Sequence, residues 1–136
     1  FGCIYYRPSR SGEKEMSCPF CGGEGEVLGN ELAFARYDAF PVSPGHLLVI
    51  PRRHVADWFD LTDEEQEAIF SLIREGKALL DAEFCPDGYN IGINCKEAAG
   101  QTIFHVHVHL IPRYAGDVEN PRGGVRGVIP EKRNYP

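Results

Sequence analysis

The sequence predicts an α+β fold in which an antiparallel sheet packs against one long helix. Residues 32–38, 89–94 and 103–111 alternate apolar and polar side chains with the period of a strand, and 46–51 is a short, mostly apolar run. Between 46–51 and 89–94, apolar residues recur at helical spacing from Ala68 to Leu80. Strand periods around a single long helix are typical of α+β proteins with antiparallel sheets.

The N-terminal third contains two predicted strands and two irregular segments. Residues 1–17 are polar without a sustained period, which predicts a flexible arm, and CPFCGGEGE at 18–26 predicts a turn-rich knuckle. The weakly alternating 32–38 predicts a strand. Residues 40–45 hold two prolines and a glycine, which predicts a loop. The next segment, 46–51, predicts a buried strand.

The long helix has a clear start and end. Thr62 and Glu65 have the spacing of a capping box, with acidic residues in the first turn, and the helix is expected to end near Phe84. Gly76 interrupts the apolar stripe at a cost of about 1 kcal/mol relative to alanine, which suggests close packing on the sheet.

The second half of the chain contains two more predicted strands and a tail. In 89–94 one face carries Ile91 and Ile93, and the other carries Asn90, Gly92 and Asn94. In 103–111, valines and a leucine are expected to face the core, which places three histidines together on the other face. Residues 113–136, rich in Gly, Pro and Arg, predict an ordered loop at best. We expect a single domain over 1–136.

Composition narrows the classes of function. The net charge of −6 argues against a general nucleic-acid-binding surface, and no apolar run is long enough for a membrane span. Five cysteines, two of them in a C-x-x-C, favour a metal or redox site in a reducing compartment over a disulfide framework. We therefore expect a cytoplasmic protein.

His105, His107 and His109 are the most informative residues. At strand spacing, neighbouring imidazoles would lie about 6.6 Å apart on one face. The three could jointly ligate a catalytic metal with an open position. Alternatively, one acts as a nucleophile on phosphorus while its neighbours supply hydrogen bonds and protons. The residues alone leave both interpretations open.

The segment His105-Val106-His107-Val108-His109-Leu110-Ile111 resembles the signature of the histidine triad family of nucleotide hydrolases and transferases. GHLLVIPRRH at 45–54 and GYNIGINCKEAAGQ at 88–101 resemble the same family, and the resemblance spans roughly 15–115. PRGGVRGVIPEK in the tail is similar to the bacterial hydrolase branch. The resemblance implies a sheet of about five antiparallel strands with one long and one short helix.

The resemblance also implies roles for individual residues. His107 matches the nucleophile that attacks the α-phosphate of a nucleotide, His109 matches the histidine that assists, and His46 matches one that orients the nucleophile. The resemblance implies phosphate contacts for Asn94, Gln101 and Thr102, and a ribose contact for Asp38. At position 102 the family commonly has serine, and threonine keeps the hydroxyl. A strand-end turn residue at Asn94, a surface charge at Asp38 and a core-edge imidazole at His46 are the simpler alternatives.

The C-x-x-C of Cys18 and Cys21 supplies two of the four ligands that a structural zinc needs. From the residues alone, Cys85, Cys95 or histidines could complete the site. The resemblance implies His54 and His105, and hence one structural zinc per chain that is not the Lewis acid of the reaction. A pair of buried thiols without metal is the alternative.

The expected function is hydrolysis of a purine nucleotide substrate such as a nucleoside phosphoramidate, an acyl-nucleotide or a dinucleoside polyphosphate. Alternatives are a nucleotidyltransferase or phosphorylase, a metal-dependent hydrolase and a non-catalytic nucleotide-binding protein; His109 favours hydrolysis, because transferases of the family often have Gln there. The resemblance further implies a homodimer. Arg113, Arg122 and Arg126 are either polyphosphate ligands or ordinary surface charges.

Overall fold

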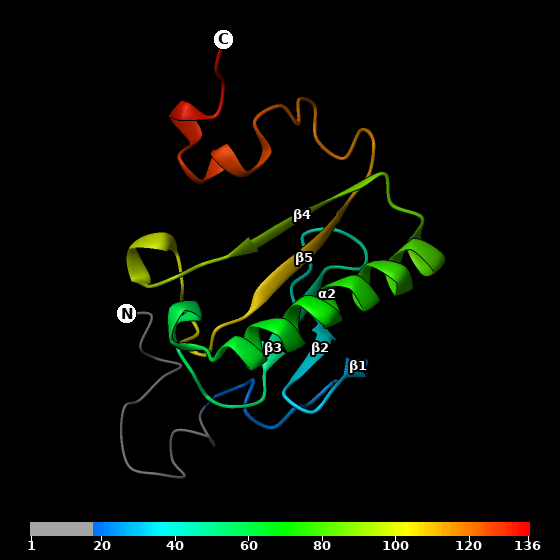
Figure 1. The fold of residues 1–136 in the computed structure, drawn as a ribbon. Helices are drawn as coiled ribbons and strands as arrows, with labels where there is room; N and C mark the ends of the chain where they lie inside the picture. The colour runs from blue at the N-terminus through cyan, green and yellow to red at the C-terminus, as the bar shows by residue number, and fades with distance from the viewer. Residues whose placement is uncertain (1–17) are drawn as a thin grey trace.

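The computed structural model describes residues 18–136, so the arm predicted for 1–17 lies outside the described residues. A five-stranded sheet has the order β1-β2-β3-β5-β4, with every neighbouring pair antiparallel (Figure 1). Its strands are β1 (Leu28–Gly29), β2 (Ala33–Tyr37), β3 (Leu47–Pro51), β4 (Gly88–Ile93) and β5 (Val108–Arg113). The predicted α+β fold is confirmed.

Helix α2 (Asp63–Phe84) crosses one face of the sheet. Its start is the predicted capping box: the Thr62 hydroxyl accepts from the Glu65 N–H, and the Glu65 carboxylate accepts from the Thr62 N–H. Gly76 lies against Leu47 and Leu110, where an added Cβ would come within 3.2 Å of both side chains. The predicted close packing at Gly76 is confirmed.

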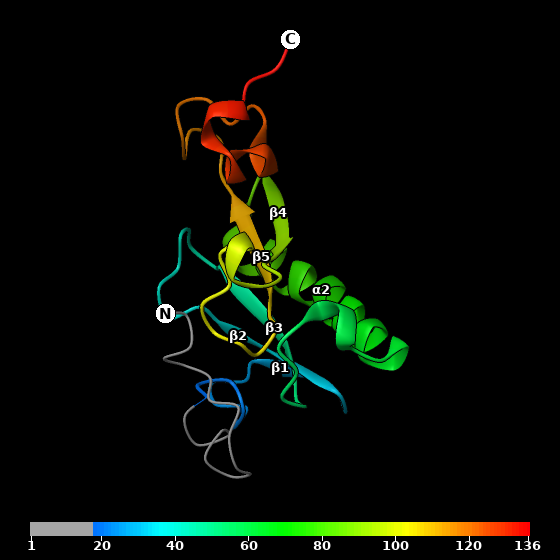
Figure 2. The same cartoon turned by 90° about the vertical axis from the view of Figure 1, so that its left-hand side faces the viewer.

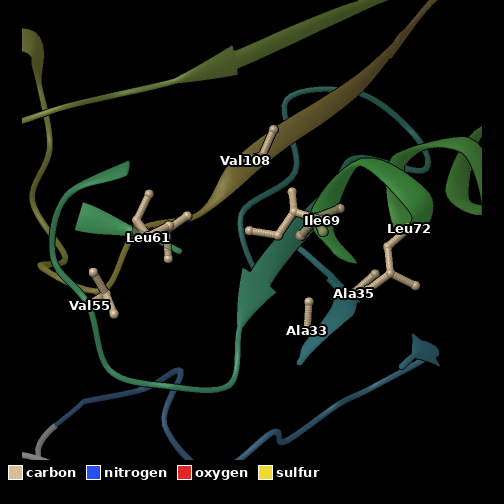
Figure 3. Packing of buried hydrophobic residues seen from close by; sticks show 9 residues of the cluster. Ala33, Ala35, Val55, Leu61, Ile69, Leu72 and Val108 are labelled. Carbon is tan, nitrogen blue, oxygen red and sulfur yellow. The ribbon is translucent and has the colours of Figure 1, made fainter. Parts of the chain in front are cut away.

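The main core lies between α2 and the sheet. Figure 3 shows Ile69 and Leu72 of the helix over Ala33 and Ala35 of β2 and Val108 of β5. All five side chains are at most 1% exposed. The alternation of β5 therefore places Val108 and Leu110 under the helix, as predicted, and turns His109 to the opposite face.

The opposite face of the sheet is covered differently. A second apolar cluster joins Phe34, Leu48 and Ile50 of the sheet to Cys18 and Phe20 of the N-terminal knuckle. Figure 2 shows α2 on one side of the sheet and the loop 38–46 on the other. This second face carries the histidines.

Two details of the sheet differ from the prediction. The last strand was predicted over 103–111, but β5 begins at Val108, because the Val106 N–H donates to the Val55 carbonyl outside the sheet. His105 and His107 therefore precede the strand. The short β1 was not predicted, since two residues are too few to show a period.

Short 3-10 helices complete the described chain. They are η2 (Trp58–Asp60), η3 (Glu97–Ala99), η4 (Gly124–Val128) and η5 (Pro130–Lys132). The last two lie in the Gly- and Arg-rich tail, beside β4 (Figure 1). Within residues 18–136, no helix combines the length and the apolar character that crossing a membrane requires.

Candidate functional site

A cavity of about 270 Å³ lies on the sheet face opposite α2. Its lining includes His107, His109 and the four polar residues predicted to contact a nucleotide, Asp38, Asn94, Gln101 and Thr102. Apolar side chains from separate parts of the chain complete it: Phe20, Phe40, Leu48 and Ile103. A polar floor with an apolar flank suits a ligand that has both a charged and an apolar part.

The ring of His107 is held in one tautomer. Its Nδ1 lies 2.9 Å from the carbonyl oxygen of His105, and a carbonyl can only accept, so Nδ1–H donates. The other nitrogen, Nε2, then keeps its lone pair. Burial lowers the pKa of His107, which keeps the ring neutral at pH 7. A neutral imidazole with a fixed lone pair at a cavity wall can act as a nucleophile.

A hydrogen-bonded relay lies behind His109, and His46, which was expected to orient His107, makes its ring hydrogen bond to His109 instead. The backbone N–H of Val42 donates to Nδ1 of His46 at 3.1 Å, so the neutral His46 ring carries its proton on Nε2. That proton is donated to Nδ1 of His109 at 2.9 Å, which in turn places the His109 proton on Nε2. Burial lowers the pKa of His46 and, with repulsion from its neighbours, that of His109 to about 4. Both rings are therefore neutral at pH 7.

Asp38, His46 and His109 also offer three ligand atoms within 4.8 Å of one another, a spacing that a metal could bridge. The Val42 N–H opposes this use. A metal on Nε2 of His46 would move the ring proton to Nδ1, directly against that donor. The Asp38 carboxylate, 3.5 Å from Nε2 of His46, instead supports the relay. This group is better described as a hydrogen-bond relay than as a metal centre.

Gln101 is only 2% exposed and is occupied by the backbone. Its amide donates to the carbonyls of Ala56 and Ile103, and its side-chain oxygen accepts from the Lys96 N–H at 2.7 Å. These bonds hold together the loop that leads to His105. The side chain therefore braces the cavity wall, and no donor of its amide remains directed at a phosphate.

The metal-type residues form a separate cluster. Ligand atoms of Cys18, Cys21, His54 and His105 all lie within 4.8 Å of one another. His105 donates its Nε2–H to the Pro51 carbonyl at 2.7 Å, which leaves Nδ1 facing Cys18 Sγ at 3.4 Å. Nδ1 of His54 lies 3.0 Å from Cys21 Sγ. Burial lowers the pKa of His105 to about 4, which favours the neutral, metal-binding ring.

Two thiols and two imidazole nitrogens at this spacing fit a tetrahedral structural zinc ion. Of the alternative ligands, Cys85 is exposed at the end of α2 and Cys95 is outside the cluster, so the histidines complete the set. His105 therefore belongs to the metal cluster and does not share the cavity with His107 and His109. The expectation that all three imidazoles line one face is wrong for His105, because its ring is buried with the thiols at 0% exposure.

Phe20 links the two sites and was not predicted. It lies between the two cysteines of the knuckle, is 5% exposed and packs edge-on against His107 with ring centroids 5.1 Å apart. The same ring lies 6.1 Å from that of His105. Its place inside the C-x-x-C was the only available sequence signal, and it does not show which ring the phenylalanine contacts.

The tail arginines do not reach the histidine cavity. Arg122 and Arg126 donate to backbone carbonyls of the tail, and both lie over the ring of Tyr135 at 4.8 Å. Arg113 pairs with Asp117 through two hydrogen bonds. In this structure the three side chains serve the fold of the tail.

Comparison with known proteins gives a family and several relatives. The model of the HIT domain, the histidine triad, matches residues 25–116. An uncharacterized HIT-like protein of Mycoplasma pneumoniae is 41% identical over 104 residues, which are 72% of each chain. A Bis(5′-adenosyl)-triphosphatase of Dictyostelium discoideum is 41% identical over 66% of this chain and 60% of its own length. An AP-4-A phosphorylase of Mycobacterium tuberculosis is 35% identical, but the match covers 47% of that protein.

Solved structures agree with the sequence matches. A HIT family protein from Bacillus anthracis superposes with a TM-score of 0.65 at 44% identity, covering 68% of this chain and 66% of that one. A zinc-bound histidine triad family protein from Mycobacterium smegmatis superposes with a TM-score of 0.70 at 33% identity, covering 78% and 81%. With a family model over most of its length and relatives of this similarity, the chain belongs to the HIT domain family.

Proposed function

We propose that this protein is a nucleotide hydrolase that cleaves at the α-phosphate through a covalent nucleotidyl-histidine on His107 and releases a mononucleotide. Its substrates are nucleoside phosphoramidates, acyl-nucleotides or dinucleoside polyphosphates, with a purine base. The observation that carries the proposal is the tautomer of His107, whose Nδ1–H is held by a carbonyl so that Nε2 offers a lone pair at the cavity wall. Relatives named as a triphosphatase and a phosphorylase of adenosine nucleotides support it.

In the first step, Nε2 of His107 attacks the α-phosphorus, and the bond from phosphorus to the leaving atom breaks. A phosphate leaving group takes the electron pair and needs no proton near pH 7. An ammonia or amine leaving group takes a proton, which His109 supplies from Nε2 after the anionic substrate has raised its pKa and the ring has taken up a second proton from solvent. The carbonyl of His105 stabilises the positive charge that His107 acquires.

In the second step, water attacks the phosphorus and loses a proton to His109 or to solvent, while the P–N bond breaks and returns the lone pair to His107. His109 and His46 are the proposed donors and relay. Asn94 and Thr102 are proposed phosphate contacts, and Asp38 the ribose contact. Gln101 is proposed as a positioning residue, because its amide is committed to the backbone. The knuckle residues Cys18, Cys21, His54 and His105 would hold a zinc ion that supports the loop before β5.

The test compares wild-type protein with His107→Asn on adenosine phosphoramidate and on diadenosine polyphosphates. The variant should lose turnover by at least about 10⁴-fold while it keeps zinc content and circular dichroism, since removing a nucleophile costs several kcal/mol in the transition state. Acid-quenched wild-type enzyme should carry a nucleotide on His107. Absence of turnover on every substrate, together with retained nucleotide binding, would instead indicate a binding protein.

A phosphorylase is the second candidate, because one relative carries that name. The two reactions differ in the acceptor. With diadenosine tetraphosphate and inorganic phosphate, a hydrolase releases AMP and ATP, whereas a phosphorylase releases ADP and ATP. Identification of the nucleotide products in phosphate buffer therefore separates the two.

A further inference from the structure

A second cavity, of about 300 Å³, continues the histidine face toward the C-terminal tail. Residues 109, 111 and 113 of β5 point to the same side of the sheet. His109 lines the first cavity, whereas Ile111 and Arg113 line the second. The two cavities are thus neighbours, about 7 Å apart along the strand.

The floor between the two cavities is open. Gly92 of β4 is paired with His109, and Asn90, which lines the second cavity, is paired with Ile111. A Cβ added at Gly92 would meet no described atom within 4 Å. Val42, whose N–H donates to His46 behind His109, also lines the second cavity. A ligand attached to phosphorus at His107 can therefore extend past His109 over Gly92.

The lining of the second cavity indicates what it would hold. Val42, Ile111 and Val118 give an apolar wall. The Ser43 hydroxyl donates to the Pro112 carbonyl and the Asn90 oxygen accepts from Arg113, which leaves the Asn90 amide N–H groups as polar donors. Arg113 is neutralised by Asp117, but Arg133 makes no ion pair within residues 18–136. The tail that encloses this space, 113–136, has five basic and three acidic side chains in a protein whose net charge is −6. An uncommitted guanidinium beside an apolar wall suits a phosphate attached to an apolar body.

We propose that this second cavity is a leaving-group subsite that binds a nucleoside phosphate, so that the protein favours dinucleoside polyphosphates over substrates with small leaving groups. This rests on the proposed function. The bond between the α-phosphorus and the bridging oxygen breaks, and the nucleoside phosphate departs with the electron pair while it is held by Arg133. The volume of about 300 Å³ is at the lower end for ligand pockets, which fits one nucleoside fragment.

The experiment uses two substrates that place the same adenylyl group on His107: adenosine 5′-phosphoramidate, which releases ammonia, and diadenosine triphosphate, which releases ADP. The readout is the ratio of kcat/KM for the second substrate to that for the first. Arg133→Gln should lower this ratio about tenfold. Lys132→Gln removes the same charge from the neighbouring residue, which does not line the cavity, and should leave the ratio unchanged.

A second pair of variants tests the passage. Gly92→Val places a side chain between the cavities without requiring an unusual backbone angle, and should also lower the ratio about tenfold. Gly88→Val makes the same change in open space farther along β4 and should have little effect on it. If the wild type turns over both substrates and every variant has the wild-type ratio, the leaving-group subsite is wrong but the proposed function stands. The same conclusion follows if the wild type turns over the phosphoramidate only. Turnover of neither substrate by the wild type would overturn the proposed function as well.

Discussion

Nδ1 of His107 faces the His105 carbonyl, and this single contact decides which nitrogen is available for reaction. The same reasoning assigns the proton to Nε2 in His46 and His109. Long-range ¹H–¹⁵N correlation spectra distinguish the two tautomers of each ring. We expect Nδ1–H for His107 and Nε2–H for the other two, unchanged between pH 8 and pH 7, because burial lowers all three pKa values from their ordinary value. A spectrum with His107 as Nε2–H would contradict the assignment of the nucleophile.

Phe20 limits how the His107 ring can turn, since the two rings pack edge-on with centroids 5.1 Å apart. Phe20→Leu should lower kcat about tenfold and change KM less, because the ring of His107 gains freedom while leucine keeps an apolar side chain in the cavity wall. Phe34→Leu is the matched control, since Phe34 belongs to the same cluster but does not line the cavity. Equal losses of kcat in the two variants would mean that only general packing matters. Metal analysis would show whether zinc content is preserved.

At the scale of the element, helix α2 depends on Glu65 at its first turn. The hydrogen bond from Arg53 lowers the pKa of Glu65 to about 2. Since Glu in an unfolded chain titrates near 4.3, the stabilisation is complete above that pH and is lost as the pH falls toward 2. Glu65→Gln should therefore lower the free energy of unfolding by about 1–2 kcal/mol at pH 7, a value reduced because Arg53 is half exposed.

Urea unfolding of wild-type protein and Glu65→Gln at pH 7 and pH 3 measures this effect. The difference between the two proteins should shrink at the lower pH. Lys77→Gln removes an exposed ion pair in the same helix and should change stability by less than about 0.5 kcal/mol. A difference that stays constant with pH would show that Glu65 acts through packing and not through its charge.

The elements with a strong period or a capping signal could be predicted from the sequence, and those that depend on distant partners could not. Helix α2 and the strands β2, β3 and β4 follow local patterns that the fold preserves. The start of β5 does not follow the local pattern, because the His105 ring contacts Cys18, which lies 87 residues earlier in the chain. Alternation predicts a continuous strand there, since a period of two contains no information about a partner elsewhere in the chain.

The site was predictable to a similar extent. His107, His109 and the four polar residues of the cavity were identified by resemblance, and the structure places them around one space. The role of the Gln101 amide was not predictable, because it depends on the carbonyls of Ala56 and Ile103. Sequence also could not show that Val42 donates to His46, since a backbone N–H has no residue type.

At the scale of the whole molecule, the metal cluster joins three distant segments, because Cys18, His54 and His105 meet at one point. Removing zinc should lower the melting temperature by at least about 10 °C, since metal binding of this kind contributes directly to folding. Calorimetry with and without a chelator measures the shift.

Metal analysis should give about one zinc per chain, with a loss in Cys18→Ser and none in Cys85→Ser, whose thiol is exposed. Full zinc content in Cys18→Ser would contradict the site.

The free edge of the sheet bears on assembly. Within residues 18–136, β4 pairs on one side only, and Ile91 on this strand is 51% exposed. Because an unpaired strand with an exposed apolar residue favours association, we expect a homodimer joined near this edge. Ile91→Glu should shift the mass measured by light scattering toward that of one chain. A wild-type mass of one chain at micromolar concentration would contradict this expectation.

Strand β5 buries Val108 and Leu110 under the helix and presents His109 and Ile111 on the opposite side. A single residue inserted or deleted between His107 and Leu110 would exchange the two sides, driving an imidazole into the hydrocarbon interior and a valine into the ligand space. Individual side chains of this segment can be replaced one at a time, but its length cannot change by an odd number. Among natural variants, length polymorphism should therefore be confined to the loops that flank it.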